Sequence, residues 1–269
     1  LGSSWEPGWR PSGTDSVVIQ DVANDPQLTV DANTNRVRVD AGAVLDTNQN
    51  DLQISNEGGS VYNTATAPVG AASAIENAGR IDREGGDRID VVQGFTGPIP
   101  GLTRYTSTGT LQADYGADDY VNLTIDTDLE GAGSADVDAD LGVTGNLTVT
   151  SGTLGATDLG ISVDGNTVVS AGAAIQTVNG GTQTYTGTVT NTGTITGGDG
   201  LVHVQSDLTS DADLVTDAAA VVVGAGGLRV DGTASFAGSE GGSLTGAVAG
   251  GVDPTLEFRG DLTFGANGA

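Results

Sequence analysis

The sequence predicts an all-β chain wound as a right-handed parallel β-solenoid, in which the short strands of successive coils stack on one another. Three observations support this: short segments that alternate apolar and polar residues, turn residues at regular intervals, and internal repeats. Helix signals are nearly absent, because Lys and Met are missing and Gly and β-branched residues are frequent among the 269 residues. We therefore expect β structure along the whole chain.

Ten short segments carry the strand pattern. Each is bounded by Asn, Asp or Gly, which favour turns, and turn residues recur roughly every 8–10 residues. This spacing fits a solenoid and also a pair of β-sandwiches, which is the alternative fold. The segments are 16–19, 27–30, 36–39, 51–54, 120–125, 146–149, 160–163, 201–204, 227–230 and 261–264.

Internal repeats favour the solenoid over the sandwich. The motif apolar-x-Asn-x-Gly-x-apolar occurs at 75–81 and again at 189–195, and a strand followed by a small residue and Gly occurs at 37–45 and 147–154. A solenoid coil cannot bury its own apolar face and needs its neighbours, so similar coils of roughly 20 residues recur. Asn and Gly tolerate the backbone of the corners, where stacked Asn side chains can hydrogen-bond from coil to coil.

The most irregular segment suggests a division of the chain. Residues 94–110 contain Pro98, Pro100 and several Gly, and we expect them to form an irregular loop. This loop would separate two lobes. The first is an N-terminal solenoid lobe with its cap over 1–93, and the second is a C-terminal solenoid lobe over 111–269.

The chain is strongly acidic and lacks both Cys and Lys. Its 35 Asp and Glu against nine Arg give a net charge of −26, which repels nucleic acid and anionic membrane surfaces. No apolar run approaches the ~18 residues of a membrane span. Disulfides, Cys-ligated metals and Lys Schiff-base chemistry are excluded. We expect no nucleic-acid partner and no membrane insertion.

The sequence offers no convincing catalytic group. His203 is the single histidine and alternates with Val202 and Val204, so we expect it to project from the opposite face. No second His and no Cys could share a metal with it, and a Ser–His–Asp triad would rest on it alone. We predict no catalytic residue and no enzyme activity; an enzyme acting on polysaccharide is the third hypothesis.

Three alternating carboxylates raise the question of calcium. Asp136, Asp138 and Asp140 would share one face of a strand and could bind Ca²⁺ weakly. Leu141 stands where an EF-hand loop needs Gly, so a solvated acidic face is the favoured interpretation. We expect no other cofactor.

Two glycosylation sequons occur, Asn122-Leu-Thr124 and Asn146-Leu-Thr148. Both lie in predicted strands, where a glycan fits only if the Asn faces outward. The abundance of Asn and Thr in this chain favours coincidence.

The segment 5–19, Trp-Glu-Pro-Gly-Trp-Arg-Pro-Ser-Gly-Thr-Asp-Ser-Val-Val-Ile, resembles the first coil of many secreted bacterial β-solenoid proteins. Segments 120–125 and 145–154 are similar to their inner repeats. These are filamentous-haemagglutinin-type and autotransporter-passenger-type surface proteins and large repeat proteins exported by Bacteroidetes. The resemblance implies export, an extracellular or cell-surface location, and an adhesive or scaffold role. It names no active site.

The leading functional hypothesis is a secreted structural subunit that polymerises end to end with copies of itself into a fibre or surface layer. Open solenoid ends expose unpaired strand edges, which invite association. The expected contacts are Trp5 and Trp9 at one end and Phe258 and Phe264 at the other. The alternative is a monomeric adhesin that binds surface glycans.

Overall fold

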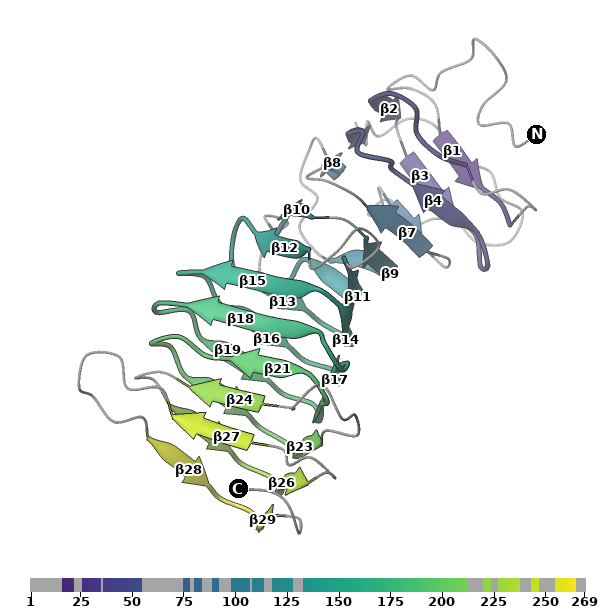
Figure 1. The fold of residues 1–269 in the computed structure, drawn as a ribbon. Helices are drawn as coiled ribbons and strands as arrows, with labels where there is room; N and C mark the ends of the chain where they lie inside the picture. Colours follow the sequence, from purple (N-terminus) through teal and green to yellow (C-terminus); the bar gives the residue numbers. More distant parts are fainter. Residues whose placement is uncertain are drawn as a thin grey trace.

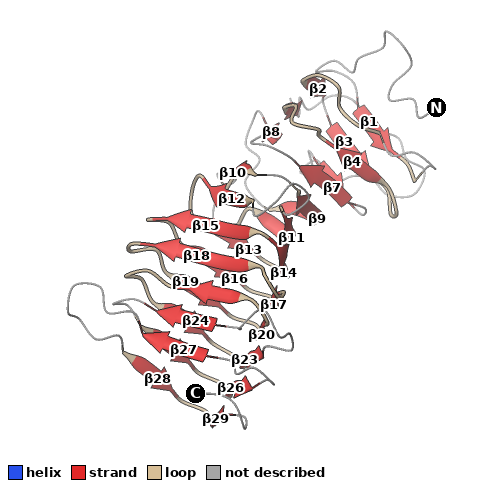
Figure 2. Ribbon diagram, viewed as in Figure 1, coloured by secondary structure: helices blue, strands red, loops and turns tan. Residues whose placement is uncertain are grey.

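The computed structural model consists of parallel β-strands stacked in coils (Figures 1 and 2). It describes residues 16–21, 26–34, 36–54, 75–77, 80–83, 89–91, 98–106, 108–113, 118–127, 133–211, 220–223, 227–237, 243–246 and 255–264. The strand pairs among these residues are parallel. The parallel β-solenoid predicted from the sequence is therefore confirmed. Nowhere in these ranges is there a helix that could cross a membrane.

Three strands make up each coil from residue 134 onward, and equivalent strands of successive coils form three columns. The first column contains β13 (Leu141–Val143), β16 (Ile161–Val163), β19 (Gln183–Tyr185), β22 (Val202–Val204), β25 (Leu228–Val230) and β28 (Leu256–Phe258). The second contains β14 (Leu147–Ser151), β17 (Thr167–Val169), β20 (Val189–Asn191), β23 (Leu208–Asp211), β26 (Ala234–Ala237) and β29 (Leu262–Phe264). The third contains β10 (Gly109–Leu111), β12 (Ser134–Val137), β15 (Thr153–Thr157), β18 (Ala174–Val178), β21 (Thr194–Thr196), β24 (Ala220–Val223) and β27 (Ser243–Gly246).

The N-terminal strands are arranged in the same way. One column is β1 (Ser16–Ile19), β3 (Arg36–Val39) and β6 (Ile75–Asn77), and another is β2 (Ala32–Thr34), β5 (Leu52–Ile54) and β8 (Ile89–Val91). In the third, β4 (Val44–Asp46) pairs with β7 (Arg80–Arg83), and β7 pairs with β9 (Ile99–Tyr105). Strand β9 in turn pairs with β11 (Tyr120–Asp126), from which the first and second columns of the later coils continue.

The prediction of an irregular loop over 94–110 is wrong for most of the described residues of this segment, because β9 and the start of β10 lie there. Two Pro and several Gly suggested a break in the strand pattern. The structure accommodates them with an extra residue in β9: Ile99 pairs with Tyr120 and Leu102 with Asn122, so three residue steps oppose two. Gly101 adopts a φ of 75° at this bulge, which Gly tolerates. The division into two lobes stays a prediction.

The core runs along the axis of the coils, because every second side chain of a strand points inward and stacks on its equivalent in the next coil. One inward row of the first column holds Val143, Val163, Tyr185, Val204, Val230 and Phe258 in register. All but Phe258 are at most 2% exposed. Burying a side chain of this size stabilises the fold by about 1.5–3 kcal/mol, so each coil depends on its neighbours for stability.

The corner before the second column contains a ladder of Asn side chains, as the sequence suggested. The backbone N–H of Asn146 donates to Oδ1 of Asn122 at 3.0 Å, and the N–H of Asn166 donates to Oδ1 of Asn146 at 3.0 Å. The N–H of Thr188 donates to Oδ1 of Asn166 at 3.1 Å. We call these four residues the Asn corner. Each bond ties one coil to the next and adds to the backbone hydrogen bonds that the same residues make between coils.

Candidate functional site

The last described coil exposes apolar side chains that the fold otherwise buries. They are Leu256 (45% exposed), Leu262 (42%) and Phe264 (46%), in strands β28 and β29. Their paired residues in the preceding coil, Leu228, Ala234 and Phe236, are 0% exposed. Among the described residues β28 and β29 each pair on one side only, with β25 and β26. We call the surface formed by Leu256, Leu262 and Phe264 the end face.

Aromatic contacts hold the end face on the rod. The ring of Phe264 stacks on Phe236 at 5.6 Å between centroids, and Phe258 meets Phe236 edge to face at 6.5 Å. Of the predicted assembly contacts, Phe264 therefore lies on the end face, whereas Phe258 is partly buried beside it. Trp5 and Trp9 lie outside the described residues. Leu256 and Leu262 were not predicted as contacts.

A cluster of charged side chains crosses three coils beside the end face. His203, Arg229 and Glu257 occupy the same outward position of β22, β25 and β28. Asp231 joins them: its carboxylate lies 2.9 Å from Nε2 of His203, 2.9 Å from Nε of Arg229 and 3.4 Å from Nη1 of Arg259. The outward projection of His203 is confirmed. We call these five residues the outer charge cluster.

The outer charge cluster lowers the pKa of one of its members, Asp231. The hydrogen bond from His203, followed by that from Arg229, holds the pKa of Asp231 below its ordinary value of 3.8. A lowered pKa in the folded state means that ionised Asp231 stabilises the fold above the ordinary pKa. This contribution is lost as the pH falls through the lowered pKa.

We therefore expect the melting temperature of the wild type to fall more steeply than that of Asp231→Asn between about pH 5 and pH 2. Thermal unfolding followed by circular dichroism measures both slopes. Asp126, whose pKa is lowered by Arg104 and then by Ser151, is the same in both proteins and its effect cancels. Equal slopes would show that the cluster contributes no pH-dependent stability.

The three alternating carboxylates point to different partners. Oδ1 of Asp136 accepts from Ser134 Oγ, Oδ1 of Asp138 from the backbone N–H of Ala113, and Oδ1 of Asp140 from the N–H of Gly160, each at 2.7 Å. Asp136 lies in β12, whereas Asp138 and Asp140 lie in the turn that follows this strand. Within the described ranges no three His, Cys, Asp or Glu side chains are grouped to hold a metal. Calcium binding by these residues stays a prediction.

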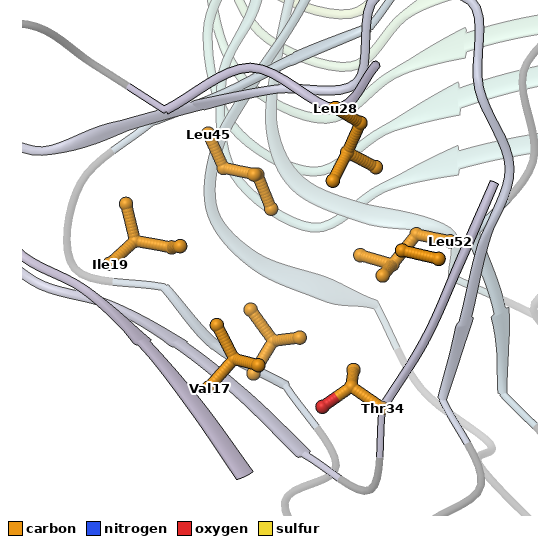
Figure 3. A pocket seen from close by; sticks show the side chains of 8 residues that line it. Val17, Ile19, Leu28, Thr34, Leu45 and Leu52 are labelled. Atoms are coloured by element: carbon orange, nitrogen blue, oxygen red, sulfur yellow. The ribbon is translucent and has the colours of Figure 1, made fainter. Parts of the chain in front are cut away.

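An apolar gap inside the N-terminal coils offers little room for a ligand. It measures about 10 Å³ and is drawn in Figure 3. Its walls are the side chains of Val17, Ile19, Leu28, Ala32, Thr34, Val37, Leu45 and Leu52. One water needs about this volume and two or more polar partners, whereas Thr34 alone supplies a hydroxyl here. The gap is a packing feature of the core.

Several polar side chains that the sequence interpretation missed lie in the interior. Arg83 is 0% exposed and its Nη1 donates to the hydroxyl of Tyr120 at 2.8 Å, which donates to the carbonyl of Gln112 at 2.6 Å. Gln183 is also 0% exposed. The alternation of inward and outward positions could have indicated that both side chains are buried. Arg83 lies two positions after the buried Ile81, and Gln183 two positions before the buried Tyr185.

Comparison with known proteins finds no family model, no curated protein and no solved structure that matches this chain. The structure itself defines the class, a parallel β-solenoid with three strands per coil over its later coils.

Proposed function

We propose that this protein is an extracellular structural subunit whose rods associate end to end, into a fibre or a surface layer. The observation that carries the proposal is the end face, where three large apolar side chains are 42–46% exposed and two strands pair on one side only among the described residues. Exposed strand edges pair readily with further strands, and covering exposed apolar side chains with another coil lowers the free energy.

A second copy of the chain is the partner that fits the end face. In every inner step of the rod, a coil is covered by another coil whose parallel strands have the same columnar spacing. At the opposite end, β1 and β2 pair on one side only among the described residues, with β3 and β5. The first coil of one copy stacked on the end face of another would continue the columns at the usual ~4.8 Å strand spacing.

Two features of the sequence support the location. The segment 5–19 resembles the first coil of secreted bacterial surface proteins, and the net charge of −26 keeps the rods soluble. In concentrated salt this repulsion is screened within about 3 Å, so acidic rods can approach one another. The surface proteins that segments 5–19, 120–125 and 145–154 resemble have adhesive or scaffold roles, which supports a scaffold role here.

Charged substitutions on the two sides of β29 test the assembly. We expect the full chain in molar salt to sediment as species larger than the monomer and to form rods of increasing length in electron micrographs. Phe264→Asp should return it to monomers, because a carboxylate would be buried without a partner. Thr263→Asp adds the same charge to the same strand on the outward side and should leave association unchanged.

Phe264→Asp could also abolish association by unfolding the end coil, because it removes the ring that stacks on Phe236. Leu262→Asp is therefore a companion variant: it places a charge on the end face and leaves this aromatic contact intact. Dispersed wild-type monomers would overturn the proposal and favour the monomeric adhesin. Assembly that survives both Phe264→Asp and Leu262→Asp would show that the rods associate through another surface.

A further inference from the structure

We propose that Asn146 is an acceptor site for an N-linked glycan and that Asn122, one coil earlier with the same sequon, is not. This inference rests on the extracellular location in the proposed function, because N-linked glycans are attached to exported chains. It does not rest on end-to-end assembly. The two Asn side chains occupy the same corner, so their surroundings can be compared directly.

The side chain of Asn146 presents its amide nitrogen to solvent. Asn146 is exposed, and its Oδ1 accepts the backbone N–H of Asn166 at 3.0 Å. The structure gives Nδ2 of Asn146 no hydrogen-bond partner among the described residues. Thr148, the third residue of the sequon, alternates with the buried Leu147 and Val149 and so points to the outside. Both groups that a glycosyltransferase must contact are therefore on the surface.

Glycosylation is compatible with the Asn corner. In the transfer, Nδ2 forms a bond to the anomeric carbon of a lipid-diphosphate-linked oligosaccharide, the bond from that carbon to the phosphate oxygen breaks, and the lipid diphosphate leaves. One Nδ2 proton passes to a base of the transferase. The amide carbonyl is retained, so Oδ1 can still accept the N–H of Asn166 and the two coils stay joined.

Asn122 differs from Asn146 in its exposure and in the hydrogen bonding of its amide nitrogen. It is partly buried, and its Nδ2 donates to the carbonyl oxygen of Gly101 in β9 at 3.3 Å. A sugar on this nitrogen would have to lie against β9 or break that bond. Asn166 provides the opposite control: it is exposed at the same corner, but Val168 stands at the third position, so it has no sequon.

The test expresses the full chain behind a cleavable secretory leader in a eukaryotic cell that attaches N-linked glycans. Protein from the medium is cut at Asp and Glu, because trypsin would leave both sequons in one peptide, 105–229. Peptide N-glycosidase in heavy-oxygen water then converts each glycosylated Asn to a mass-labelled Asp. We expect the label on Asn146 in most molecules and on Asn122 in few.

Matched variants separate the sequon from the fold. Thr148→Val copies the Asn166 coil and should remove the label, Thr148→Ser should keep it, and Thr124→Val should change nothing at Asn146. Secreted wild type with unlabelled Asn146, or with Asn122 labelled as much as Asn146, would overturn the inference. Either result leaves end-to-end association to its own sedimentation test, since the protein analysed has reached the medium.

Discussion

Gly165→Ala is expected to destabilise the solenoid by about 2–3 kcal/mol, whereas Gly180→Ala should leave its stability within about 0.5 kcal/mol. A Cβ at Gly165 would lie far inside 3.0 Å of the carbonyl group of Gly145 in the preceding coil. That neighbour is backbone in a hydrogen-bonded corner, so no flexible side chain can move aside. At Gly180 a Cβ would meet nothing within 4 Å.

The expected effect is large because the close approach recurs along the rod. Five of the six corner residues that precede the second column are Gly, and a Cβ at each of the five would meet the preceding coil within 3.0 Å: Gly145, Gly165, Gly187, Gly232 and Gly260. The sixth, in the coil of β22 and β23, is Ser206. Displacing one coil at this corner also strains the hydrogen bonds of the Asn corner on both sides. Stability in a solenoid depends on such contacts between neighbouring coils.

Urea denaturation of wild type, Gly165→Ala and Gly180→Ala at one salt concentration measures the effect. Gly180 is exposed in a turn, so Ala there reports the general consequence of adding a methyl group to a Gly. Similar midpoints for the two variants would mean that the corner can widen without cost, and that the Gly row does not fix the coil spacing.

The fold could be predicted from the sequence because its determinants are local. Segments such as 146–149 and 201–204 alternate strictly, and both are strands bounded by polar turns. The repeat length also followed: first-column strands begin at residues 141, 161, 183 and 202, or about 20 residues apart. In β9 the local signal was misleading, because a bulge absorbs Pro100 and Gly101 within a strand whose pairing is set by β7 and β11.

The candidate site depends on contacts between coils, which the sequence pattern did not reveal. Asp231 meets His203 across 28 positions in sequence, a separation that depends on the length of one particular coil. Leu262 has the same pattern as the buried Leu147, yet it is exposed because no described coil covers it. The three Asp of 136–140 alternate as expected, but two of them lie beyond the end of β12. Phe264, predicted as an assembly contact, lies on the end face, and its role in association stays a prediction.

A second large effect is expected at Gln183, whose replacement by Leu should destabilise the protein by about 2 kcal/mol although Leu141 and Leu228 occupy the same column. The residues in register with Gln183 in the neighbouring coils have apolar side chains and offer no hydrogen-bond acceptor. Gln183 Oε1 accepts a hydrogen bond from the hydroxyl of the fully buried Tyr185 at 2.7 Å. With Leu at 183 this hydroxyl would be buried without an acceptor, which costs about 1–3 kcal/mol.

Removing both partners should restore most of the loss. Gln183 Nε2 also donates to Thr177 Oγ1 and to the carbonyl of Thr196, but the Thr177 hydroxyl itself reaches that carbonyl at 3.4 Å. The double variant Gln183→Leu/Tyr185→Phe would therefore leave no newly unpaired donor. Its free energy of unfolding should lie within about 1 kcal/mol of the wild-type value. A double-mutant cycle by urea denaturation measures the coupling, expected at about 1–3 kcal/mol. Additive single effects would contradict the role of this bond, and the cost at Gln183 would then reflect the fit of Leu in the core.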